Sequence, residues 1–115
     1  MNEYEKLQKE IKKFLKEYLT EKQILSKPII YDDRIIEEIT VDDVLIIINI
    51  IIGEFMSNII LDAYYGSNSE LYENQSITIR LHNIPNEDMH IIKAFKEIYP
   101  KFEKMVKYYK ILKEL

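Results

Sequence analysis

The chain of 115 residues contains no cysteine and only two glycines. Without cysteine it can form no disulfide, no thiolate metal site and no thiol nucleophile. Gly53 and Gly66 have no glycine neighbour at the spacing of a phosphate-binding or dinucleotide-binding loop, so neither motif is present. His82 and His90 lack the further ligands that a closed metal site requires. These absences predict no metal and no cofactor, and they favour binding or assembly over catalysis.

A signal for secretion or membrane insertion is also missing. The N-terminus carries charged residues from its start, unlike the leading segment of a secretory signal. The most apolar run, residues 44–61, only reaches the lower limit of about 18 residues for a membrane span. Because this run contains Asn49, Gly53 and Glu54, we expect a protein that is neither secreted nor bound to a membrane.

Basic residues are scarce in the middle of the chain. The net charge is −4, from 16 Lys and Arg against 20 Asp and Glu. Residues 1–40 sum to −1, residues 41–74 to −6 because they contain no base, and residues 75–115 to +3. An acidic centre followed by a basic end is an asymmetry that can mark a partner surface.

Hydrophobic periodicity predicts a single α+β domain over residues 1–115 that is mostly helical. Apolar residues recur at steps of three and four near the N-terminus, which predicts an amphipathic helix within residues 1–24. Residues 25–40 are interpreted as a connection. We expect this connection to contain a strand or extended arm at 28–31 and a short helix at 34–39.

The isoleucine-rich residues 41–65 decide the predicted architecture. A buried strand is one interpretation of such a run. Asn49, Gly53 and Ser57 are spaced four apart, however, and such residues form a polar stripe on a helix. We therefore predict a long central helix that Gly66 ends. Apolar residues cover most of its circumference, so a second copy of the chain is needed to bury it. The predicted dimer core consists of Ile48, Ile51, Ile52, Phe55 and Ile59.

The last third of the chain combines a strand with helical segments. Residues 76–81 alternate apolar and polar, which predicts a half-buried strand, and residues 82–86 form the turn after it. Residues 88–96 fit either a helix or the second strand of a hairpin, and their apolar spacing favours the helix. A closing helix follows Pro100. The expected fold is thus a long central dimerisation helix, a short strand or hairpin, and flanking N-terminal and C-terminal helices.

This order of parts resembles a known family. Residues 39–44 lead into the central helix, residues 77–84 form the strand, and the end of the chain is rich in lysine. From residue 30 to about residue 95 the chain is similar to the HU/IHF-like DNA-binding proteins. It looks most like the divergent versions that tailed bacteriophages encode. The resemblance implies an HU/IHF-like core with a C-terminal helix over residues 41–115.

The resemblance implies a non-enzymatic dimer, formed with itself or with a paralogue. Such a dimer would bind double-stranded DNA or serve as a structural or assembly component among the proteins of a phage virion. Its location would be the host cytoplasm or the virion. The lysines near the C-terminus also fit a solvated helix face that has no partner. The residues expected to contact DNA phosphates are Arg80, Lys93, Lys96, Lys101 and Lys104.

Two other interpretations stay open. One is a ribbon-helix-helix regulator, in which Ser76, Thr78 and Arg80 would read the DNA groove. The other is an acidic protein–protein interaction module or small phage inhibitor that meets a basic partner. Its contact residues would be Asp42, Asp43, Glu54, Asp62, Glu70 and Glu73.

Overall fold

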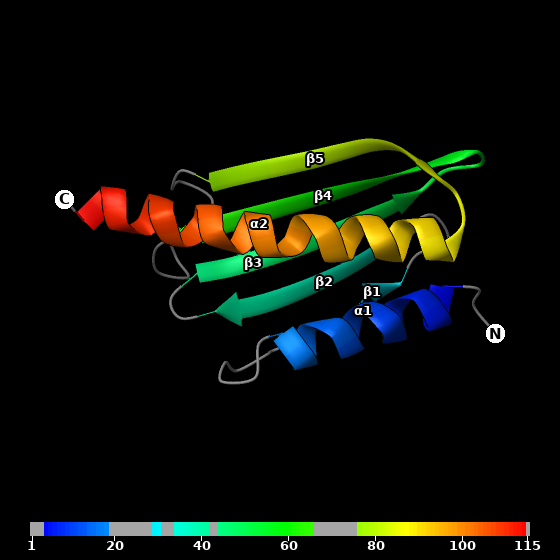
Figure 1. Ribbon diagram of the computed structural model, residues 1–115, viewed down its shortest axis with the longest axis horizontal. Helices are drawn as coiled ribbons and strands as arrows, with labels where there is room; N and C mark the ends of the chain where they lie inside the picture. Colours follow the sequence, from blue (N-terminus) through cyan, green and yellow to red (C-terminus); the bar gives the residue numbers. More distant parts are fainter. Residues whose placement is uncertain (1–3, 19–28, 31–33, 42–43, 66–75, 115) are drawn as a thin grey trace.

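The computed structural model describes residues 4–18, 29–30, 34–41, 44–65 and 76–114. Within these residues two helices lie on one face of an antiparallel sheet, which gives a two-layer α+β fold (Figure 1). The strands follow one another across the sheet in chain order, and the first of them has only two residues. The helices are α1 (Tyr4–Tyr18) and α2 (Asp88–Glu114), and the strands are β1 (Ile29–Ile30), β2 (Arg34–Val41), β3 (Val44–Ile52), β4 (Met56–Tyr65) and β5 (Ser76–Pro85).

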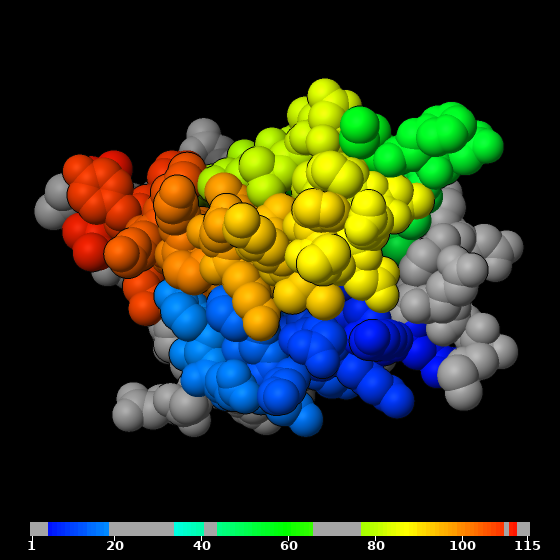
Figure 2. All heavy atoms as spheres, turned by 45° about the vertical axis from the view of Figure 1, so that its right-hand side comes forward, coloured from blue at the N-terminus to red at the C-terminus, as the bar shows by residue number. Residues whose placement is uncertain are grey.

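The predicted N-terminal helix is confirmed as α1. Its apolar residues at four-residue steps, Leu7, Ile11 and Leu15, are fully buried against the sheet and α2. The residues between them are mostly charged and face solvent. Figure 2 shows α1 and α2 packed side by side over the sheet as one continuous surface.

The predicted long central helix is wrong, because residues 44–65 form the β3–β4 hairpin. The two strands pair continuously from Val44 opposite Tyr65 to Ile52 opposite Ser57. Isoleucine and valine are branched at Cβ, which lowers their preference for helix and raises it for strand. The fold class predicted from the sequence is therefore corrected: the protein is not mostly helical, and a sheet stands where the central helix was expected.

The structure also tests the secondary structure predicted for three other segments. The short helix predicted at 34–39 is wrong, because these residues belong to β2 and pair with β3. The strand predicted at 76–81 is confirmed and continues to Pro85 as β5. The segment 88–96 is helical, as its spacing favours, and it continues through Pro100 into a single helix of 27 residues.

The core lies between the helices and one face of the sheet. Along β3 buried and half-buried residues alternate strictly, and β2 and β4 follow the same rule. The buried side chains on the sheet are mainly isoleucine, and aromatic rings of α2 fill the space above them. The largest of these rings belong to Phe95, Tyr99 and Phe102, which are completely buried.

The residues predicted to form a dimer core do not share one surface. Ile48, Ile52 and Ile59 are buried beneath the chain's own helices. Ile51 lies on the opposite face of the sheet and is half-buried. Phe55 stands in the β3–β4 turn with 78% of its surface exposed. Because a strand directs successive residues to opposite faces, the helical surface that would have joined these side chains does not exist.

Candidate functional site

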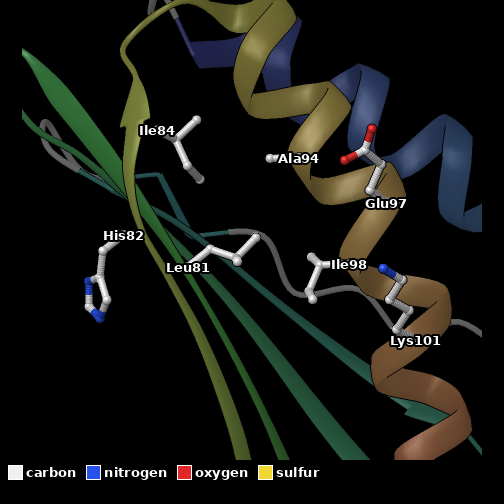
Figure 3. Close-up of a pocket in the computed structure, with 7 residues that line it drawn as sticks. All are labelled: Leu81, His82, Ile84, Ala94, Glu97, Ile98 and Lys101. Atoms are coloured by element: carbon white, nitrogen blue, oxygen red, sulfur yellow. The ribbon is translucent and has the colours of Figure 1, made fainter.

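A groove runs between the last strand of the sheet and α2. Among the described residues β5 pairs only with β4, so its outer edge is free. Leu81 and Ile84 of β5 point across the groove toward Ala94 and Ile98 of α2 (Figure 3). The groove has a volume of about 310 Å³ and a mostly apolar floor.

The apolar surface of this groove extends along most of β5. Ile77, Ile79 and Leu81 face α2 but are only half-buried, whereas their partners on β4 are buried. On α2, Met105 lies on the same side as Ala94 and Ile98 by helical spacing, and 45% of its surface is exposed. Helix α2 therefore lies over β4 and β5 and covers the inner face of β5 only in part.

Charged side chains stand at the rim of the groove. Glu97 and Lys101, one helical turn apart on α2, are both exposed and line the groove beside Ile98 (Figure 3). His82 is also exposed, but Figure 3 shows its ring pointing to the other side of β5. The groove thus combines an apolar floor with one acidic and one basic group at its helical wall.

A β-bulge in β5 shapes one end of the groove. Ile59 pairs with Leu81 and Ser57 pairs with Ile84, so two residues of β5 lie opposite Asn58 alone. Asn83 has a φ of 60°, a left-handed conformation that asparagine tolerates better than most residues. Its backbone N–H donates to Asn58 Oδ1 at 3.3 Å. The extra residue shifts the alternation of β5 by one position. Ile84 therefore faces the helices, as Leu81 does, and is buried in the core.

Asn86 ties the end of β5 to the β3–β4 turn. Its Nδ2 donates to the carbonyl oxygen of Gly53 at 2.6 Å, and its Oδ1 accepts from Ser57 Oγ at 2.9 Å. The Gly53 N–H closes the turn by donating to the carbonyl oxygen of Met56 at 3.0 Å. These bonds fix the position of β5 where the chain enters α2.

The residues expected to contact DNA lie on two sides of the sheet. Arg80 is exposed on the face opposite the helices, across from Ile60 of β4. The four lysines belong to α2: Lys101 lines the groove, and Lys96 Nζ lies 6.0 Å from the centroid of the Phe14 ring. The other two, Lys93 and Lys104, are exposed along the helix. Arg80 is therefore not brought together with the lysines.

The predicted acidic surface is also divided. Glu54 is exposed in the β3–β4 turn. Asp62 lies on the open face of the sheet and accepts a hydrogen bond from Thr78 Oγ1. The remaining acidic residues of this prediction lie outside the described residues: Asp42, Asp43, Glu70 and Glu73.

A polar cluster is enclosed between α1 and α2. Glu103 is 3% exposed and pairs with Lys107 at 3.1 Å. Burial, together with the neighbouring Glu103 and Tyr18, raises the pKa of the Tyr99 hydroxyl well above its usual range. Burial also raises the pKa of Tyr18, again with a contribution from Glu103. Tyr99 and Glu103 are buried in this cluster, whereas Tyr18 and Lys107 reach solvent.

The described residues form neither a metal-binding cluster nor a membrane-spanning helix. No three His, Cys, Asp or Glu side chains in this part of the chain come together in a way that could hold a metal ion. Neither described helix is long and apolar enough to span a bilayer.

Comparison with protein-family models, with curated proteins and with solved structures finds no match for this chain. The resemblance to HU/IHF-like proteins therefore stays a prediction, and the central helix that contributed to it is absent from the structure. The function of the protein is therefore inferred from the surfaces of its fold.

Proposed function

We propose that the protein is a non-enzymatic binding module that captures an extended segment of another protein along β5. The observation that carries this proposal is the free edge of β5 beside a half-buried apolar groove. Exposed sheet edges bind extended peptides by adding them as a further strand, with affinity from main-chain hydrogen bonds and specificity from adjacent pockets.

The groove lies where an added strand would need it. A strand paired to β5 would lie about 4.8 Å further out and would direct alternate side chains toward the helical layer. Those side chains would meet Ala94 and Ile98 from one side and Ile79 and Leu81 from the other. Each apolar side chain placed there would cover surface that is half-exposed in the free protein.

The charges around the edge favour a particular pattern in the bound segment. Side chains of the added strand that point away from the helices would pass Thr78 and Arg80, both of which are exposed. The helical wall contributes one charge of each sign, Lys101 and Glu97, so Arg80 gives the surroundings of the edge a net positive charge. We therefore expect a segment in which apolar residues alternate with polar residues that include acidic ones.

Peptide selection tests this proposal. A displayed library of random peptides of about ten residues, long enough to span β5, is selected against the purified full chain. We expect the selected peptides to alternate as described and to perturb the backbone amide NMR signals of β5. In the variant Ala94→Trp the indole occupies the groove, and we expect the affinity to fall by about tenfold or more.

Met89→Trp serves as the matched control, because Met89 is on the same helix and 68% exposed but does not line the groove. This variant is expected to bind the peptides like the wild type. The proposal is refuted if no peptide is selected. It is also refuted if Ala94→Trp binds the selected peptides as tightly as the wild type does.

A further inference from the structure

The last turns of α2 carry an exposed apolar stripe. It consists of Met105, Tyr108, Ile111 and Leu112, whose spacing of three and four residues places them on one side of the helix. Between 45% and 65% of the surface of each residue is exposed. Half of the large hydrophobic side chains that are exposed in the described part of the chain therefore gather on this short segment.

The other sides of this part of α2 pack on the chain itself. Phe102 and Val106 are buried, and the hydroxyl of Tyr65 on β4 donates a hydrogen bond of 2.9 Å to the carbonyl oxygen of Val106. Tyr99 faces Tyr18 of α1, with 5.8 Å between the ring centroids. After these contacts α2 extends beyond the ends of the strands (Figure 1). The apolar stripe therefore lies on a helix that the sheet and α1 hold in place.

The apolar stripe requires a different kind of partner from the edge of β5. A sheet edge offers unpaired main-chain groups, whereas the main-chain groups in the body of a helix are bonded to one another. A partner is therefore held here by side-chain packing. Apolar residues at three- and four-residue spacing pack against a second helix, whose side chains fit between theirs.

Lysines surround the apolar stripe. Residues 101–113 contain five lysines and a single acidic residue, Glu103, which is buried. Lys101 and Lys104 are exposed, and they lie one helical turn before the first two residues of the stripe. The surface that meets a partner is therefore apolar with a positively charged border.

This charge distinguishes between the candidate partners. A second copy of the chain would bring the same lysines to the contact, and like charges across an interface are unfavourable. An anionic membrane is wide and would also face the acidic parts of a chain whose net charge is −4. A helix with Asp and Glu beside its apolar residues would contact the lysine-rich end of α2 alone.

We propose that the last turns of α2 bind an amphipathic helix of another protein, whose apolar side is bordered by Asp and Glu. The apolar side chains of this helix cover the stripe, and its carboxylates approach Lys101 and Lys104. The site is separate from the strand-binding groove of β5, because Ala94 of that groove precedes Met105 by roughly 16 Å along the helix.

A displayed library of helical peptides tests this proposal. The peptides have about 18 residues, or five turns, with helix-forming residues on one side and random residues on the other. They are selected against the purified full chain, and their affinities are measured by fluorescence anisotropy. We expect the selected peptides to combine apolar residues at three- and four-residue spacing with flanking Asp or Glu. They should perturb the backbone amide NMR signals of residues 101–112.

Substitutions on α2 locate the bound peptide. The double variant Tyr108→Gln with Leu112→Gln removes apolar surface but keeps the helix, and we expect the dissociation constant to rise by about tenfold or more. Lys104→Glu sets a carboxylate against the acidic residues of the peptide and should raise the dissociation constant about fivefold. Met89→Gln and Lys93→Glu are the matched controls, since both residues are exposed near the start of the same helix, and they should bind like the wild type. Circular dichroism checks that each variant is folded.

The proposal is overturned if no helical peptide is selected, or if the double variant binds the selected peptides as tightly as the wild type. It is also overturned if Lys104→Glu leaves their affinity unchanged. Dimerisation in sedimentation equilibrium, or binding to vesicles of anionic lipid, that the double variant abolishes would assign the stripe to a second copy or to a membrane instead. Ala94→Trp, which fills the groove beside β5, should leave helix binding unchanged, and a loss of binding would place the helix in that groove.

Discussion

Replacing Gly53 by alanine distinguishes the observed hairpin from the helix that the sequence pattern predicts. Gly53 begins the turn between β3 and β4, and its N–H donates to the carbonyl oxygen of Met56 at 3.0 Å. A Cβ built on Gly53 would lie 2.3 Å from that same oxygen. Because the clashing atom belongs to the backbone, no side-chain rotation can relieve the contact.

The expected loss of stability can be worked from this geometry. Cβ atoms are essentially never found closer than 3.0 Å to a heavy atom, so the turn must open by about 0.7 Å from its 2.3 Å contact. Such a movement breaks the Gly53–Met56 hydrogen bond, at about 1 kcal/mol, and leaves local backbone strain of about 1–2 kcal/mol. We expect Gly53→Ala to lower the free energy of unfolding by roughly 2–3 kcal/mol. In the interior of a helix the same substitution would stabilise by about 1 kcal/mol.

Urea unfolding followed by far-ultraviolet circular dichroism measures the difference. With a slope of about 1–1.5 kcal/mol per molar urea for a small domain, the midpoint should fall by about 2 M. Glu54→Ala is the control in the same turn, since Glu54 is exposed, and its effect should stay within about 0.5 kcal/mol. All proteins are compared at one concentration. An unchanged or higher midpoint for Gly53→Ala would refute the hairpin reasoning.

Substitutions at three further positions are checked by the same unfolding measurement. Asn86→Ala removes the hydrogen bonds that tie β5 to the β3–β4 turn and should cost about 2 kcal/mol. Asn86→Asp keeps the acceptor for Ser57 Oγ but sets a carboxylate oxygen against the Gly53 carbonyl oxygen, so it should cost at least as much. Asn83→Val should cost about 1–2 kcal/mol because of its φ of 60°, while Asn83→Gly should be close to neutral. Tyr65→Phe removes a buried hydrogen bond of 2.9 Å to the carbonyl oxygen of Val106 and should cost about 1 kcal/mol. Burial, with a contribution from Tyr109, raises the pKa of Tyr65 from 10.0 to about 12. The stability it contributes is therefore complete below pH 10 and is lost as the pH rises through 12, so Tyr65→Phe should flatten that decline.

The parts of the fold that the sequence predicts correctly are those with one apolar side and one polar side. The helix α1 repeats leucine and isoleucine every four residues, with charged residues between them. The first half of β5 alternates from Ser76 to Leu81. The apolar side is buried in α1 and half-buried in β5, and the other side is more polar, so the period of the pattern identifies the element.

The groove could not be predicted in this way, because it depends on which strand lies at the edge of the sheet. The alternation of residues 76–81 indicates a strand but does not show that this strand ends the sheet. Ala94 and Ile98 are ordinary apolar positions of a helix, and only the placement of α2 over the sheet leaves them half-buried. The separation of Arg80 from the lysines of α2 likewise follows from tertiary structure.

The wrong assignment of residues 44–65 has a physical cause. A strand with one face in water alternates apolar and polar residues, and β3 does not: Leu45, Ile47 and Ile51 make its open face nearly as apolar as its buried one. The period of two is therefore hidden, and the spacing of Asn49 and Gly53 suggests a helix in its place. A continuous isoleucine run is expected of a strand that is covered on both sides. The chain's own helices cover one side of β3, and the apolar residues of its other side are half-buried, so both sides of the strand carry apolar residues and no alternation is visible in the sequence.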